Sequence, residues 1–94
     1  RKVFGEDHPA VADSCRTLAG IEEAQERYAR ARPLYERTLA IREKVLGRDH
    51  LLVARTLERY AQLLRKLERA AEAESLEARA RAIRAKYAGL KFPI

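Results

Sequence analysis

Apolar side chains recur every three or four residues along four segments of the chain, and this spacing predicts four amphipathic helices. The helices are expected from about residues 8 to 25, 28 to 46, 51 to 66 and 70 to 88. Their inward stripes are Val11, Cys15, Leu18, Ala19 and Ile21; Ala31, Leu34, Tyr35, Thr38, Ile41 and Val45; Val53, Leu57, Tyr60, Ala61 and Leu64; and Ala73, Leu76, Ala80, Ile83 and Tyr87. No segment alternates apolar and polar residues as a half-buried strand does, so the pattern predicts an all-α fold.

Turn-forming residues bound these helices. Pro9 suits a first helical turn because its missing N–H has no partner there, and Asp7 is a candidate cap or dipole partner. Gly47 and Gly89 are expected to end the second and fourth helices as C-terminal caps. Residues 90–94 form a short tail that either folds back on the last helix or is disordered.

The whole pattern repeats with an offset of 42 residues, the separation of Lys2 from Lys44. Residues 2–12, KVFGEDHPAVA, return as residues 44–54, KVLGRDHLLVA. A fixed period in this range is typical of a solenoid, in which each unit stacks on a copy of itself because it cannot bury its apolar face alone. Solenoids present long surfaces to other molecules, so the repeat favours binding over catalysis.

Length and composition limit the alternatives. The 94 residues allow one domain with a small core. The single cysteine, Cys15, cannot form an internal disulfide, which favours a reducing compartment such as the cytoplasm. No apolar run is long enough to span a bilayer and no signal-peptide pattern is present, so we expect no membrane partner.

The net charge of +6 is concentrated at the C-terminal end. Residues 78–94 contain no acidic residue and five cations: Arg79, Arg81, Arg84, Lys86 and Lys91. Such a basic end can bind the phosphates of a nucleic acid. However, cations near a helix C-terminus also stabilise the helix dipole, and few aromatic residues lie beside them for base stacking. We therefore favour a protein or peptide partner over a nucleic acid.

Candidate chemical groups do not form a catalytic or metal-binding pattern. His8 and His50 lie one repeat apart with no cluster of ligand spacing around them, which predicts loop histidines near helix starts. Cys15 lies on the inward stripe and is expected to be a small buried hydrophobe, not a nucleophile. The sequence thus predicts no enzymatic activity, no cofactor and no metal site.

Residues 32–50, RPLYERTLAIREKVLGRDH, resemble the stretch that joins two tetratricopeptide repeats, in particular the long repeats of kinesin light chains. The resemblance implies antiparallel helix pairs in a right-handed solenoid, with the first helix of each pair lining a concave groove for peptides or partner helices. It implies that Ala19 and Ala31 let the first pair approach closely and that Tyr35 packs on the next repeat.

With this resemblance, the chain divides into four parts. Residues 1–6 are the end of a preceding repeat helix, 7–47 the first repeat, 48–89 the second, and 90–94 the tail. Glu77 and Arg81 stand where the first repeat has the apolar Tyr35 and Leu39. A following repeat would have to bury both charges, which is costly when they are unpaired. We therefore expect the second repeat to be the C-terminal cap of the array.

The resemblance also indicates which residues line the groove. They are Asp13, Arg16, Gly20, Glu23 and Ala24 in the first repeat, and Arg55, Glu58, Gln62, Arg65 and Lys66 in the second. Where kinesin light chains commonly have a pair of peptide-binding Asn residues, this chain has Arg16-Thr17 and Glu58-Arg59. Arginine suits the recognition of carboxylates, so the hypothesis is that Arg16, Arg55, Arg65 and Lys66 hold an acidic peptide.

Two alternatives remain open. In the first, the groove is a solvated, salt-bridged face and the chain is a structural capping module without a ligand of its own. If the preceding repeat is missing, the outer face of the first helix is an uncovered apolar surface, which predicts self-association.

Overall fold

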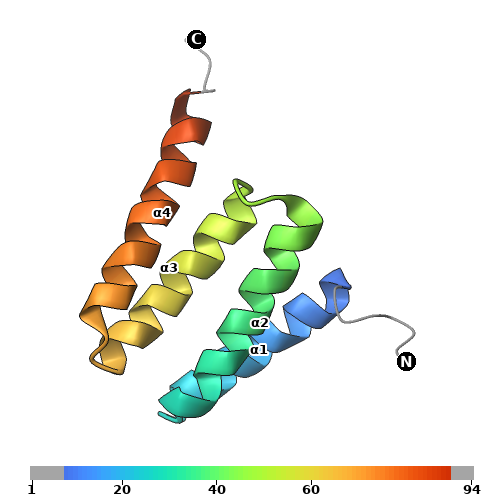
Figure 1. The fold of residues 1–94 in the computed structure, drawn as a ribbon. Coiled ribbons are helices and arrows are strands. Elements are labelled where there is room, and N and C mark those ends of the chain that lie inside the picture. Colours follow the sequence, from blue (N-terminus) through green and yellow to red (C-terminus); the bar gives the residue numbers. More distant parts are fainter. Residues whose placement is uncertain (1–7, 90–94) are drawn as a thin grey trace.

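The computed structural model of the chain describes residues 8–89, and these residues form four α-helices (Figure 1). The helices are α1 (Pro9–Ala24), α2 (Tyr28–Leu46), α3 (Leu51–Lys66) and α4 (Ala70–Gly89). The all-α prediction is confirmed, and all four helices lie within about a residue of their predicted bounds. The remnant predicted over residues 1–6 and the tail predicted over 90–94 lie outside the described residues.

The helices form two antiparallel pairs, α1 with α2 and α3 with α4, and the pairs meet where α2 packs against α3. In Figure 1, α3 lies between α2 and α4, so that the chain progresses sideways from pair to pair. The molecule measures 43 × 37 × 20 Å. A slab of this shape is the arrangement expected when each helix pair stacks on the next.

Two apolar clusters hold the pairs together. One joins both pairs: it contains the fully buried Ala19 and Ala31, whose small side chains let α1 and α2 approach, together with Tyr35 and Tyr60. The rings of these two tyrosines stack with centroids 6.1 Å apart, so Tyr35 packs on the second pair as the resemblance implied. The second cluster lies within the α3–α4 pair and includes Leu57 and Ile83.

Three residues assigned to inward stripes are instead exposed, so that part of the prediction was wrong. Leu18, Ile21 and Val45 keep 48%, 47% and 43% of their surface accessible. The contact of α1 with α2 is filled by Ala12, Cys15 and Ala19. The stripe on α1 is therefore narrower than the pattern suggested, because small residues bring the helices close together and turn the larger neighbours outward.

Both histidines cap helices. His8 Nδ1 accepts a hydrogen bond from the Ala10 N–H at 2.9 Å at the start of α1, and His50 Nδ1 accepts one from the Leu52 N–H at 3.0 Å at the start of α3. The prediction of loop histidines near helix starts is confirmed. The candidate cap Asp7 lies outside the described residues, and the N-cap of α1 is His8. A side-chain acceptor at this position satisfies a backbone N–H that has no partner within the helix.

The turn that joins the two helices has the same geometry in both pairs. Glu26 and Glu68, which are 42 residues apart, both have φ of 63°. The following N–H groups, of Arg27 and Arg69, close the helix ends with hydrogen bonds of 2.8 Å to carbonyl oxygens five residues back. This is the Schellman arrangement, here with glutamate at the left-handed position that usually holds glycine. Gly47, with φ of 98°, ends α2 as predicted.

Candidate functional site

A hollow of about 310 Å³ lies between α1 and α3. It is lined by Arg16, Arg42, Leu52, Arg55, Thr56, Glu58 and Arg59. Three of the predicted groove residues, Arg16, Arg55 and Glu58, therefore come together in one site. The predicted groove residues did not include Arg42, which reaches the hollow from α2, or the α3 residues Leu52 and Thr56.

Arg42 is held in place before any ligand arrives. Its side chain is 11% exposed; Nη1 donates to Thr56 Oγ1 at 3.0 Å and Nη2 donates to Asp13 Oδ1 at 3.0 Å. The Thr56 hydroxyl in turn donates to the Leu52 carbonyl oxygen at 2.8 Å. These bonds tie α1, α2 and α3 together and fix the direction of one guanidinium at the edge of the hollow.

In the second pair, the arginine at the same repeat position also makes an ion pair with the first helix of its pair. Arg84 on α4 donates to both carboxylate oxygens of Glu58 on α3, at 2.6 and 2.9 Å, and thereby lowers the pKa of Glu58. Both arginines end an Ala-Ile-Arg sequence, at residues 40–42 and 82–84. This repeated arginine was a signal in the sequence that could have drawn attention to Arg42 as a residue that lines the hollow.

The acidic partners of these two arginines occupy different repeat positions. In the first pair the acid is Asp13, and in the second pair the equivalent residue is Arg55. In the second pair the acid is Glu58, and in the first pair the equivalent residue is Arg16. Each repeat therefore has an acid at one of these two positions and an arginine at the other. The acid pairs with Arg42 or Arg84, and the second arginine cannot, because both groups are positive. Neither Arg16 nor Arg55 makes a direct ion pair with a residue among 8–89, although the charge of Arg55 helps to lower the pKa of Glu58; both residues line the hollow.

The other two predicted cations, Arg65 and Lys66, are already paired. Arg65 makes two hydrogen bonds to the carboxylate of Glu77 on α4, at 2.7 and 2.9 Å, and lowers the pKa of Glu77. Lys66 lies 2.9 Å from Glu23 Oε2 on α1. Both cations are therefore paired with carboxylates of the same chain, and neither of them lines the hollow.

Glu23 serves as a structural acceptor. The Tyr35 hydroxyl donates to Glu23 Oε1 at 2.7 Å, while Lys66 donates to the other oxygen. Burial alone would raise the pKa of Glu23, but these two hydrogen bonds, together with the positive charges of Lys66 and Arg59, lower the pKa below its usual value. A carboxylate held in its charged form by two donors stabilises the junction between α1, α2 and α3.

The remaining predicted groove residues carry no charge. Gly20 lies beside Arg16, whose Nη1 would be 3.8 Å from a Cβ built at that position. Ala24 and Gln62 are exposed outside the hollow.

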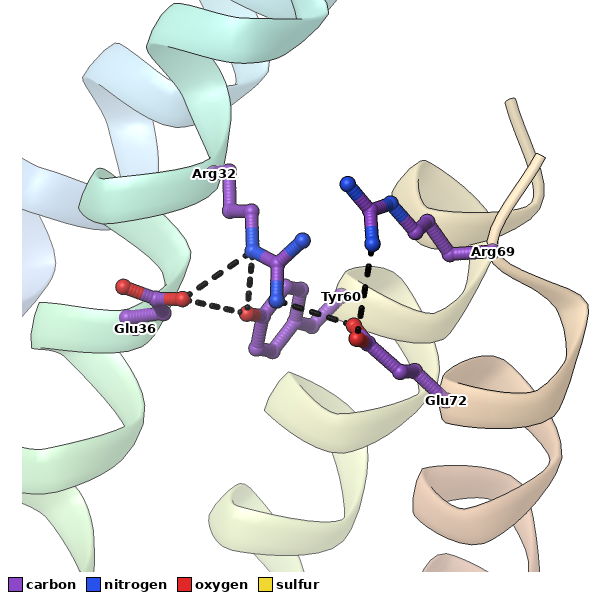
Figure 2. A network of polar contacts seen from close by, with 5 residues as sticks. All are labelled: Arg32, Glu36, Tyr60, Arg69 and Glu72. Atoms are coloured by element: carbon purple, nitrogen blue, oxygen red, sulfur yellow. Dashed lines mark hydrogen bonds and ion pairs between the residues drawn. The ribbon is translucent and has the colours of Figure 1, made fainter. Parts of the chain in front are cut away.

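A second charged cluster, shown in Figure 2, is satisfied internally. The Arg32 guanidinium lies between Glu36 at 3.1 Å, Tyr60 at 3.1 Å and Glu72 at 2.8 Å; the Tyr60 hydroxyl donates to Glu36 at 2.7 Å. Burial and the bond to Glu36 raise the pKa of Tyr60 to about 12. Arg69 completes the cluster beside Glu72. Because every group has a partner, this cluster joins α2, α3 and α4 and leaves nothing for a ligand.

The basic last helix is largely neutralised. Three ion pairs join it to the preceding elements: Arg79 with Glu43 at 2.6 Å, Arg84 with Glu58 at 2.6 Å and Lys86 with Asp49 at 2.5 Å. The cations of α4 therefore do not form a continuous unpaired track of the kind that follows a nucleic-acid backbone.

Two further findings concern other kinds of site. In the part of the chain that the structure describes, no group of three or more His, Cys, Asp or Glu side chains lies close enough together to hold a metal ion. Within that same part, no helix has the length and apolar character needed to cross a membrane. Cys15 is buried, as predicted.

Comparison with known families agrees with this architecture. A family model described as tetratricopeptide repeat matches residues 1–43 and 14–86 of the chain. The matched residues include all of α1 to α3 and most of α4. No curated protein gives a significant match.

Proposed function

The chain belongs to the tetratricopeptide-repeat family, and we propose that it binds an acidic segment of a partner protein noncovalently in the hollow between α1 and α3. Members of this family mediate protein–protein interactions. The observation that supports the proposal is that Arg16 and Arg55 line the hollow without a direct ion pair among residues 8–89. Glu58, the carboxylate beside Arg55, takes its hydrogen bonds from Arg84. The other charged residues predicted to line the groove are all paired.

An acidic partner follows from the electrostatics of this arrangement. Two guanidinium groups in a concave site repel each other and attract anions, and the partly enclosed surroundings strengthen both effects. A carboxylate between them would accept paired N–H···O bonds, which are among the stronger hydrogen bonds in proteins. Leu52, half-buried at the same site, offers an apolar contact beside the charges.

The proposal is tested by charge reversal. The probe is a fluorescein-labelled twelve-residue peptide rich in Asp and Glu, titrated with the chain and followed by fluorescence anisotropy. We expect the double variant Arg16→Glu, Arg55→Glu to lose at least about tenfold in affinity, since two attractions become two repulsions. The matched control is Arg30→Glu with Arg81→Glu, which changes the net charge equally at exposed positions outside the hollow.

If the control variant loses as much affinity as the groove variant, only the net charge matters and the hollow is not the site. A peptide of the same length rich in Lys must not bind. If the wild-type chain binds neither peptide, the proposal is wrong.

A second candidate function rests on the outer face of α1. Leu18 and Ile21 are about half exposed there, beside an apolar hollow of about 280 Å³ that includes Val11 and Cys15. We propose, as the alternative, that a second copy of the chain covers this face. Sedimentation over a concentration series tests it: Leu18→Ser with Ile21→Ser should abolish any dimer, whereas the groove variant should leave it unchanged.

Finer features of the chain are also part of the proposal. We propose that its repeats are of the long type found in kinesin light chains, which is supported by the identical caps and turns that recur 42 residues apart at His8 and His50 and at Glu26 and Glu68. We further propose that the second repeat caps the array and that the chain acts as a scaffold or adaptor segment in the cytoplasm. The charged Glu77, at the position of the buried Tyr35, supports the capping role.

A further inference from the structure

The hollow carries more positive charge than one carboxylate neutralises. Four arginines and one glutamate line it, and the glutamate, Glu58, already takes both its hydrogen bonds from Arg84. Arg42 is paired with Asp13. Three further guanidinium groups, those of Arg16, Arg55 and Arg59, line the hollow without a direct ion pair among the described residues. Of these, Arg59 also interacts with the Tyr35 hydroxyl and the charge of Glu23, and the charge of Arg55 acts on Glu58.

The size of the hollow limits what can enter it. At about 310 Å³ it is at the small end of the range for ligand sites, which accommodates one side-chain head group but not a helix. Its anionic occupant must therefore concentrate its charge on a single group. A phosphoryl group does so, because it carries close to two negative charges at neutral pH and has three strong acceptor oxygens.

We propose that the hollow binds the phosphoryl group of a phosphoserine in a partner peptide. This inference rests on the proposed function and names the group that the partner inserts. Arg16 approaches from α1, and Arg55 and Arg59 approach from α3, so donors surround the group from two helices. Arg42 adds a guanidinium that Thr56 and Asp13 hold in place, which reduces the conformational entropy lost on binding.

A peptide fits the surroundings better than a nucleic acid does. The cations at the C-terminal end of α3, beyond the hollow, are paired: Arg65 with Glu77, and Lys66 with Glu23. A nucleic-acid strand needs a row of available cations and aromatic side chains for its successive phosphates and bases. The structure offers one concentrated anion site, which matches a single modified residue in a peptide.

The test compares three labelled peptides that share the same acidic flanks and differ only at the central residue, which is phosphoserine, glutamate or serine. We expect the phosphoserine peptide to bind the chain at least about tenfold more tightly than the glutamate peptide, because the second charge and third oxygen engage additional guanidinium groups. In the variant Arg16→Gln, Arg55→Gln this preference should disappear. In the matched variant Arg30→Gln, Arg81→Gln it should persist.

The possible outcomes distinguish the preference for phosphoserine from the binding of an acidic segment on which it rests. If the three peptides bind equally, and binding is still lost in the Arg16→Gln, Arg55→Gln variant, acidic-segment binding stands and the phosphoserine preference is wrong. If none binds, both are wrong. Equal competition by inorganic phosphate and by unlabelled phosphopeptide would mean that the free ion suffices and no peptide is recognised. Displacement by a single-stranded RNA that is stronger than displacement by the phosphopeptide would assign the hollow to nucleic acid instead.

Discussion

The two helix pairs treat the same repeat position in opposite ways. In the first pair Tyr35 is fully buried, its ring stacks on Tyr60, and its hydroxyl donates to Glu23 on α1. In the second pair the equivalent contact is an ion pair, in which Arg65 on α3 makes two hydrogen bonds to the partly exposed Glu77 on α4. Both contacts join the two helices of a pair. The difference is that Tyr35 also packs against the next helix pair, through Tyr60, whereas the contact given for Glu77 among the described residues lies within its own pair.

The paired arginines show the same contrast. Arg42 is buried to 11% exposure under α3, whereas Arg84 remains 46% exposed. Each makes an ion pair to the first helix of its own pair, but only Arg42 also bonds to the following helix, through Thr56. The comparison leads to three predictions, given in order of decreasing effect on stability.

The largest effect should come from removing the buried ring. Tyr35→Ala is expected to cost about 3–5 kcal/mol in the free energy of unfolding, as large-to-small changes of aromatic core residues do, and it should leave so small a domain largely unfolded. Glu77→Ala should cost less than about 1 kcal/mol, because it removes a solvent-exposed ion pair. Urea denaturation followed by far-ultraviolet circular dichroism measures both.

Tyr35→Phe is the matched control, since it keeps the ring and removes only the hydrogen bond to Glu23, at a cost of about 1 kcal/mol. Equal losses for the alanine variants at positions 35 and 77 would contradict the contrast between the two pairs.

A smaller difference in the loss of stability is expected when Arg42 and Arg84 are each replaced by alanine. Arg42→Ala should cost about 1–3 kcal/mol, because it removes two charge-assisted hydrogen bonds and the packing of a buried side chain. Arg84→Ala should cost under about 1 kcal/mol, and this cost should shrink in high salt, which screens exposed ion pairs. The measurement is urea denaturation at low and high sodium chloride. If Arg84→Ala instead loses more stability than Arg42→Ala, and this loss does not change with salt, then Arg84 and not Arg42 makes the stronger contact.

The smallest effect should be the same in both pairs. Glu26→Gly and Glu68→Gly relieve a left-handed conformation that costs a residue with a Cβ about 1–2 kcal/mol, and the added chain entropy of glycine offsets about half of that. Each is expected to stabilise the chain by about 0.5–1 kcal/mol. The measurement is thermal melting of each glycine variant and of the alanine variant at the same position. Alanine keeps the Cβ, so the alanine variant should not be more stable than the wild type. Stabilisation at only one of the two positions would show that the turns differ.

Local features of the fold were predictable from the sequence. The spacing of apolar residues located all four helices, and the histidines and glycine near their ends marked loops and caps, because these depend on side chains a few positions apart. The width of the apolar stripes was not predictable. Leu18 and Val45 satisfy the helical spacing, yet they lie outside the contact because alanines at Ala12 and Ala19 draw α1 against α2.

The candidate site was predictable only in part. The resemblance selected Arg16, Arg55 and Glu58, which do line the hollow, but also Arg65 and Lys66, which are paired elsewhere. No property of these two cations in the sequence distinguishes them from the unpaired ones.

The sequence by itself determined the helices and their ends, since each follows from residue type and spacing along one segment. Only the tertiary structure decided which charges remain available. An ion pair requires two side chains from different helices to come within a few ångströms of each other, and that distance depends on how closely the helices pack. For this reason the lining of the hollow by four arginines, two of which (Arg16 and Arg55) make no direct ion pair among the described residues, depends on the placement of α1, α2 and α3 together.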